Sequence, residues 1–135
     1  MKRSMARELC MKILYEMYMN KKYDRDILAS YIEEEGEKLE SQKEYVTTVV
    51  TSFLDNKEKV DSVLEQYAIG WHVDRMAKVD LAILRLAMTE ILFIEDIPYN
   101  VSINEALELS KKYSTEESSP FINGILGKMV DKEEK

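Results

Sequence analysis

The chain has 135 residues, 45% of them hydrophobic and 33% charged, and its formal net charge is −7. These values fit one globular domain and exclude a disordered or collagen-like chain. Cys10 is the lone cysteine, which excludes an intrachain disulfide and favours a reducing, cytoplasmic setting. Charged side chains within residues 1–8 argue against a signal peptide. The longest apolar stretch, residues 81–94, is too short to span a bilayer, and we expect Arg85 and Glu90, which interrupt it, to pair with charges elsewhere.

Charge is unevenly distributed along the chain. Residues 1–25 carry a balance of +4, whereas residues 26–135 carry −11. Such asymmetry predicts an electropositive patch for an anionic partner on an otherwise acidic body. A basic helix that is only solvated would give the same count, so charge alone leaves both interpretations open.

Apolar residues recur at spacings of three and four along most of the chain, which predicts helices and no strand. The expected helices cover residues 3–20, 27–32, 41–54, 56–70, 74–96 (in one or two pieces), 102–113 and 120–130. Residues 33–40 contain five Glu and a Gly and are expected to form a charged loop. About seven helices with short links predict an all-α domain. The break near Gly70 divides it into two helical halves, residues 1–70 and 71–135.

Capping residues indicate where two of these helices begin. Ser41 with Glu44, and Ser102 with Glu105, have the spacing of a capping box, in which each side chain binds a free backbone N–H of the other residue. Pro98 is expected to end the long helix before the second box.

Small and amide residues indicate close packing in the second half. Gly124 and Gly127 lie three apart in the last expected helix, where each costs about 1 kcal/mol relative to alanine. The expected reason is the close approach of another helix. Asn104 and Asn123 are expected to be buried amides that bind backbone groups at helix ends.

Catalytic and metal-binding motifs are not found in the sequence. His72 is the only histidine, and we find no Gly-rich phosphate loop, nucleophile elbow or zinc-type spacing. Glu33, Glu34 and Glu35 are adjacent, so they cannot converge on a metal from one helix face. No constellation argues for an enzyme, a cofactor or a metal site.

The first helix carries the strongest functional signal. At about 100° per residue, one of its faces presents a continuous strip of basic and aromatic side chains, namely Arg3, Arg7, Met11, Tyr15, Tyr18 and Lys22. Cations neutralise phosphates, and rings stack on unpaired bases at about 1–3 kcal/mol per base, so single-stranded RNA fits this mixture. The alternative is that the tyrosines pack against a neighbouring helix and the arginines cover its edge.

Several short motifs resemble those of the NusB family of transcription antitermination factors, in the family's order and over nearly the whole chain. They are Ala6-Arg7-Glu8, Leu14-Tyr15, Ile83-Leu84-Arg85-Leu86-Ala87, Glu90-Ile91-Leu92, Ile97-Pro98, Ile103-Asn104-Glu105-Ala106-Leu107-Glu108-Leu109 and Phe121-Ile122-Asn123-Gly124-Ile125-Leu126. The resemblance implies two small helical bundles packed as one domain. It also implies a factor that binds the boxA element of nascent RNA together with the ribosomal protein NusE. Such a complex helps RNA polymerase to read through terminators in ribosomal RNA operons.

The resemblance also implies which residues take part. The family's arginine-rich start corresponds to Arg3 and Arg7, and Ser4 and Met5 stand where some relatives have further arginines. RNA affinity is therefore expected to rest more on Lys2, Lys22 and the tyrosines. The RNA contacts implied by the resemblance are Tyr15, Tyr67, Tyr99, Glu117 and Phe121, and those to the partner protein are Asp74 and Asp80. The family also allows a homodimer that hides the basic helix.

Two other functions stay open from the sequence. The module also resembles the N-terminal domain of certain ribosomal-RNA cytosine methyltransferases, but this sequence ends at Lys135 without a methyl-donor domain. A helical adaptor without RNA contact is the third interpretation. Charge reversal at Arg3 and Arg7 separates the adaptor from an RNA-binding factor, and a thermal-shift screen with S-adenosylmethionine tests the methyltransferase interpretation.

Overall fold

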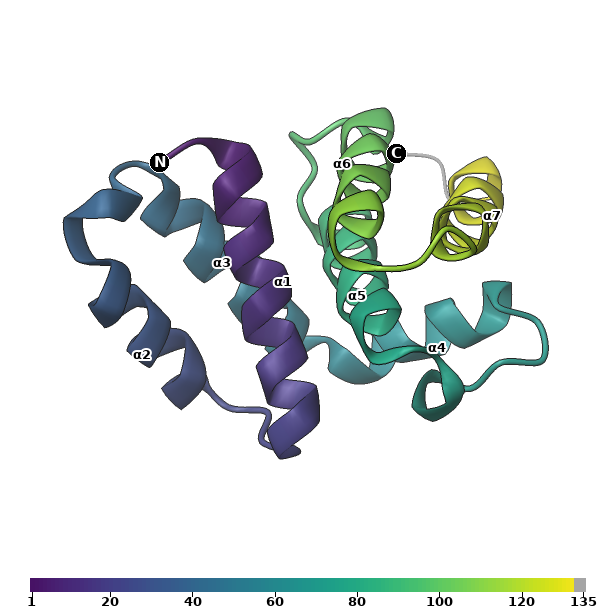
Figure 1. The fold of residues 1–135 in the computed structure, drawn as a ribbon, viewed down its shortest axis with the longest axis horizontal. Helices are drawn as coiled ribbons and strands as arrows, with labels where there is room; N and C mark the ends of the chain where they lie inside the picture. Colours follow the sequence, from purple (N-terminus) through teal and green to yellow (C-terminus); the bar gives the residue numbers. More distant parts are fainter. Residues whose placement is uncertain (133–135) are drawn as a thin grey trace.

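A computed structural model describes residues 1–132 as seven α-helices and two short 3-10 helices, with no strand in that range (Figure 1). The all-α prediction is therefore confirmed. The helices are α1 (Arg3–Asn20), α2 (Arg25–Glu35), η1 (Gly36–Leu39), α3 (Gln42–Asp55), α4 (Lys57–Tyr67), η2 (Val73–Arg75), α5 (Lys78–Phe93), α6 (Tyr99–Tyr113) and α7 (Ser118–Lys132).

The helix α5 lies at the centre of the molecule. It packs against α1, α3, α4, α6 and α7, and Figure 1 shows α1–α3 on one side of it and α7 on the other. Every residue from 80 to 91 is buried, because neighbours surround this helix on all sides. The near-continuous apolar sequence of residues 81–94 follows from that position.

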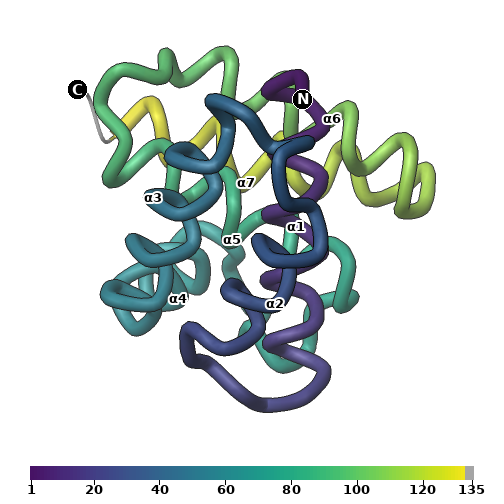
Figure 2. Tube along the Cα trace, turned by 90° about the vertical axis from the view of Figure 1, so that its left-hand side faces the viewer, coloured from purple at the N-terminus to yellow at the C-terminus, as the bar shows by residue number. Residues whose placement is uncertain are grey.

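The other helices cover α5 and bury their apolar faces in one continuous core. In the view of Figure 2, α2 and α3 lie nearest the viewer and cover α1 and α5. Phe53 from α3, Met17 from α1 and Leu126 from α7 are each fully buried. Complete burial of such side chains stabilises the fold by about 1.5–3 kcal/mol each.

Both predicted capping boxes are wrong. Ser41 precedes α3 but makes no side-chain cap hydrogen bond. Ser102 lies inside α6, which begins at Tyr99 after Pro98, and its hydroxyl donates to Glu90 instead. Pro98 is the residue immediately before α6. Proline suits this position because its fixed φ is compatible with a helix N-terminus and it has no backbone N–H that needs a partner.

The segment 33–40 is more ordered than the predicted charged loop. The helix α2 continues to Glu35, and η1 follows it with Leu39 fully buried. Gly36 separates the two helices with a φ of +55°, in the region that glycine adopts most readily. The chain therefore turns at Gly36 and returns Leu39 to the core.

The packing predicted around the glycines of α7 is also wrong. A methyl group added at Gly124 or Gly127 would meet no atom within 4 Å, so no helix of residues 1–132 approaches them closely. Asn104 and Asn123 are exposed and not buried. Both features leave small or polar residues on the surface of the second half.

Candidate nucleic-acid interface

Lys2 and Arg3 form an exposed basic surface at the start of α1. The Nε of Arg3 donates to Gln42 Oε1 at 2.6 Å, and its guanidinium carbon lies 4.1 Å from the centre of the Tyr45 ring. The cation–π contact and the amide orient the guanidinium while its other N–H groups remain available to a ligand. Arg3 is therefore placed as a phosphate-binding group.

The structure contradicts the predicted continuous strip along α1. Arg7, Met11 and Tyr18 are only 5%, 4% and 8% exposed, because α1 packs against α2, α3 and α5. Two cations lie close to the ring of Tyr18, with Lys21 Nζ 3.8 Å and the Arg85 guanidinium carbon 5.6 Å from its centre. The alternative, in which the tyrosines pack against a neighbouring helix, therefore holds for Tyr18, and Arg7 and Met11 are buried on the same face.

Tyr15 and Lys22 remain accessible. Tyr15 is half-buried and lines an apolar hollow of about 170 Å³ between α1, α5 and α6, with walls from Met11, Lys12, Val79, Ala82 and Tyr113. Lys22 is exposed, with its Nζ 3.3 Å from Asp26 and 3.9 Å from Asp24. Exposed pairs of this kind are worth about 0–1 kcal/mol, so they do not prevent Lys22 from meeting a phosphate.

Aromatic side chains gather where α7 begins. Phe121 is half-buried and meets Trp71 edge to face, with ring centres 6.1 Å apart and planes at 72°. Trp71 is 50% exposed and Ile69 is 79% exposed. The sequence motif indicated Phe121, but it did not indicate Trp71, because exposure depends on how the segment between α4 and α5 folds.

The other predicted RNA contacts occupy different environments. Glu117 is exposed in the turn before α7, and Tyr99 is half-buried in the first turn of α6. Tyr67 is only 9% exposed at the end of α4, so it offers little surface to a ligand.

The two residues predicted to contact the partner protein also differ in exposure. Asp74 is exposed in η2. Asp80 is 6% exposed, and its carboxylate accepts hydrogen bonds from Ser114 Oγ at 2.6 Å and Ser118 Oγ at 3.0 Å. Asp80 thus fixes the turn between α6 and α7.

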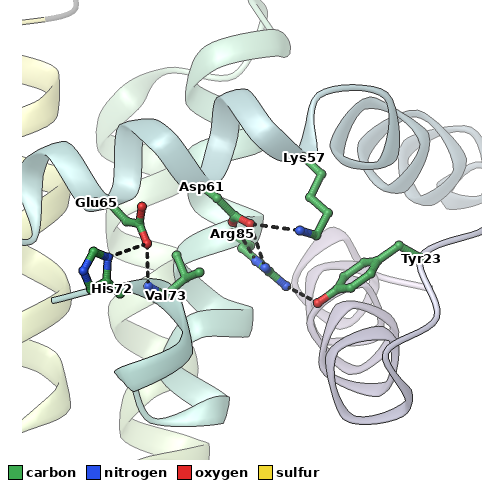
Figure 3. A network of polar contacts seen from close by, with 7 residues as sticks. All are labelled: Tyr23, Lys57, Asp61, Glu65, His72, Val73 and Arg85. Carbon is green, nitrogen blue, oxygen red and sulfur yellow. Dashed lines mark hydrogen bonds and ion pairs between the residues drawn. The ribbon is translucent and has the colours of Figure 1, made fainter.

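A polar network holds α4 against α5, as Figure 3 shows. Arg85 donates to both oxygens of Asp61, at 2.9 and 2.8 Å, and to the Tyr23 hydroxyl at 2.9 Å. Burial lowers the pKa of Arg85, but its hydrogen bond to Asp61 and the charge of that carboxylate outweigh burial and raise the pKa overall. The expectation that Arg85 pairs with a distant charge is confirmed.

The same helix also fixes η2. Glu65 on α4 accepts a hydrogen bond from the backbone N–H of Val73 at 2.9 Å and lies 3.4 Å from His72 Nδ1 (Figure 3). These contacts position the segment that carries Asp74. Sequence spacing could not reveal them, because the partners meet only through the turn after α4.

Within residues 1–132, no three His, Cys, Asp or Glu side chains are grouped as metal ligands. No helix in that range has both the length and the apolar character to cross a bilayer. The fold and its surfaces therefore define a small all-α protein that exposes two basic side chains at the start of α1 and aromatic side chains near the start of α7, on an otherwise acidic body.

Comparisons with known proteins specify the family. The model of the NusB family matches residues 4–131. The transcription antitermination protein NusB of Alkaliphilus oremlandii is 48% identical over 133 residues, which cover 98% of this chain and 96% of that protein. The corresponding protein of Acetivibrio thermocellus is 44% identical over 130 residues, covering 96% and 89%. The chain belongs to the NusB family.

Solved structures agree with this assignment. NusB from T. maritima superposes with a TM-score of 0.91 at 31% identity, covering 100% of this chain and 94% of that one. A crystal structure of the antitermination factors NusB and NusE in complex with dsRNA matches with a TM-score of 0.85 at 25% identity, covering 96% of each chain.

Proposed function

We propose that this chain is a non-catalytic transcription antitermination factor. It binds boxA-type single-stranded RNA together with the ribosomal protein NusE and promotes read-through in ribosomal RNA operons. The observation that carries the proposal is the family match over residues 4–131, supported by likeness to a NusB crystallised with NusE and dsRNA. The relatives are named as antitermination proteins and not as enzymes.

The proposed RNA surface has a basic part and an aromatic part. Lys2, Arg3 and Lys22 supply cations for phosphates, and Tyr15, Tyr99 and Phe121 supply rings for unpaired bases. Glu117 precedes Phe121 by four residues, and its backbone carbonyl accepts a hydrogen bond from the Phe121 N–H at 3.4 Å; its exposed carboxylate can accept a hydrogen bond from a base amino group. We assign the buried Tyr18 and Tyr67 to the support of this surface.

The proposed protein surface lies in the acidic part of the chain. Asp74 is exposed on η2, which Glu65 holds in place, and residues 26–135 carry a net charge of −11. Such a body attracts a basic ribosomal protein. Binding RNA and protein on one complex raises the effective affinity of each contact without a single strong site.

The proposed setting is the cytoplasmic antitermination complex with RNA polymerase. A homodimer that hides the basic surface would compete with RNA for it. Sedimentation of the chain with and without RNA distinguishes a dimer from an RNA-bound monomer. If RNA dissociates a dimer, the dimer and the RNA share that surface.

Fluorescence anisotropy with labelled boxA RNA tests the proposal. We expect tighter binding to boxA than to a scrambled strand or to a duplex of the same sequence, and a further gain when NusE is added. Over about 50–200 mM salt, log affinity should fall by about 0.7 per phosphate contact for each unit of log salt concentration. Arg3→Gln should reduce that slope by one contact, whereas the exposed control Arg25→Gln should not.

Equal affinity for boxA and scrambled RNA, in the presence of NusE, would contradict the proposal. A chain that binds NusE but no RNA at all would be the helical adaptor. A slope near zero would remove the phosphate contacts from the account.

A further inference from the structure

The carboxylate of Glu90 lies in the interior, where its side chain is 1% exposed. It accepts hydrogen bonds from Arg7 Nε on α1 at 2.9 Å, from Ser102 Oγ on α6 at 2.7 Å and from the Tyr45 hydroxyl on α3. Since Glu90 belongs to α5, one side chain fixes four helices relative to one another. We refer to Glu90, Arg7, Tyr45 and Ser102 as the Glu90 cluster.

Arg7 uses its donors inside the protein. Its Nε donates to Glu90 and its Nη1 donates to Glu105 Oε1 at 3.2 Å. Burial lowers the pKa of this guanidinium, but the hydrogen bond and the negative charge of Glu90 outweigh burial and raise the pKa overall. Arg7 therefore stays charged, and two carboxylates more than balance its single positive charge.

The groove beside Arg7 offers a phosphate no net electrostatic attraction. It lies between α1 and α6, has a volume of about 440 Å³ and is lined by three glutamates, Glu8, Glu105 and Glu108. Two lysines also line it, and each pairs with one of these glutamates. Together with Arg7, the lining carries three positive and three negative charges, so an RNA phosphate in this groove would meet no net positive charge.

Tyr45 connects the cluster to the exposed arginine of the N-terminal surface. Its hydroxyl donates to Glu90, while its ring lies 4.1 Å from the guanidinium carbon of Arg3. Gln42, on the same helix, accepts a hydrogen bond from Arg3 Nε. The ring and the amide therefore set the position of Arg3, and Glu90 sets the position of the ring.

We propose that Arg7 and Glu90 are positioning residues for RNA binding, which hold Tyr45 and Arg3 in place without touching RNA themselves. The inference rests on the proposed function and gives Arg7 a different role from the phosphate contact that the sequence predicts. RNA affinity then depends on Arg7 through Arg3, and not through a charge that Arg7 presents to the ligand.

The test measures boxA affinity against salt concentration, with NusE present and at a temperature where far-UV circular dichroism shows each variant folded. Arg7→Gln leaves Glu90 without its cation, so we expect binding to weaken about tenfold with an unchanged salt slope. Adding Glu90→Gln removes the unpaired buried charge, so the double variant should recover most of the affinity. Arg3→Gln should lower the slope by about 0.7.

A destabilising variant outside the cluster is the matched control. Asp61→Ala breaks the buried pair with Arg85 and should leave RNA affinity unchanged once the folded fraction is taken into account. If Asp61→Ala weakens binding as much as Arg7→Gln does, the cluster contributes only stability and the inference is wrong.

Two further results would overturn the inference. One is a slope reduced by about 0.7 in Arg7→Gln without rescue by Glu90→Gln, which would make Arg7 a phosphate ligand. The other is an unchanged affinity in Arg7→Gln. If Arg7→Gln does not fold, the double variant Arg7→Gln with Glu90→Gln is measured in its place. A salt slope and an affinity like those of the wild type would support the positioning role of Arg7, and a reduced slope would contradict it. A wild type without preference for boxA would instead contradict the proposed function, and this inference with it.

Discussion

Removing the carboxylate of Asp61 should destabilise the protein severely. The Arg85 side chain is 2% exposed, and Asp61 accepts two of its three hydrogen bonds, leaving only the neutral hydroxyl of Tyr23. Breaking a buried pair from one side costs about 3–5 kcal/mol, because the remaining charge stays buried without a counter-charge. Domains have about 5–15 kcal/mol of total stability, so Asp61→Ala removes a large share of it.

Urea unfolding followed by far-UV circular dichroism measures this loss. The matched control is Asp55→Ala, since Asp55 pairs with Arg25 at 3.3 Å and both side chains are more than 60% exposed. An exposed pair is worth about 0–1 kcal/mol, so the control should unfold almost as the wild type does. Combining Asp61→Leu with Arg85→Met should recover most of the stability, because apolar side chains then replace the pair.

Two results would refute this reasoning. If Asp61→Ala loses no more stability than Asp55→Ala, the pair with Arg85 is not buried as the structure has it. If the loss disappears in concentrated salt, the pair is screened by solvent and cannot be buried.

Four further predictions follow from single residues. Gly124→Ala should raise the free energy of unfolding by about 1 kcal/mol in urea, because a helical glycine with open space beside it gains helix propensity; a loss would reveal a contact there. Cys10 is fully buried and burial raises its pKa, so a thiol reagent should label it only as fast as the protein opens, and rapid labelling of native protein would contradict its burial. Burial and the nearby Cys10 and Glu90 also raise the pKa of Tyr45. On a rise in pH the unfolded chain therefore loses the Cys10 and Tyr45 protons before the folded protein does, and the free energy of unfolding should fall above about pH 9–10, by about 1.4 kcal/mol per pH unit for each of the two groups. Tyr45→Phe should make this fall shallower, and a pH profile identical to that of the wild type would refute the prediction. Asp80→Ala should cost about 1–3 kcal/mol because two serine hydroxyls lose their acceptor, whereas Asp74→Ala should keep its melting temperature and lose affinity for NusE; the reverse pattern would exchange their roles.

The sequence predicts the helices because most of them are amphipathic. Their apolar residues recur at the helical period, and α5 is found from its apolar composition even though it is buried all round. Helix ends are less predictable, because a side chain with the sequence pattern of a cap can form its hydrogen bond with another side chain instead of with the backbone at the helix end. Ser102 does so when its hydroxyl donates to Glu90, a residue whose proximity depends on how α5 and α6 pack.

Site residues can be predicted from the sequence where a motif indicates them, but not where their role depends on whether the fold leaves the side chain exposed. Helical geometry shows which side chains share one face of α1, but a single helix does not reveal that neighbours cover Arg7, Met11 and Tyr18 on that face. Arg85 and Glu90 interrupt an apolar run, which correctly indicated that they pair. Their partners lie 24 and 83 positions away, and such distances in sequence carry no signal of contact.

Terminator read-through tests the central claim most directly. Transcription through a ribosomal RNA leader and a terminator is measured with RNA polymerase and NusE, with and without this chain, on templates with intact or scrambled boxA. The account predicts that the chain raises read-through only on the intact template and only when NusE is present. Equal read-through on both templates, or no response to the chain, would contradict it.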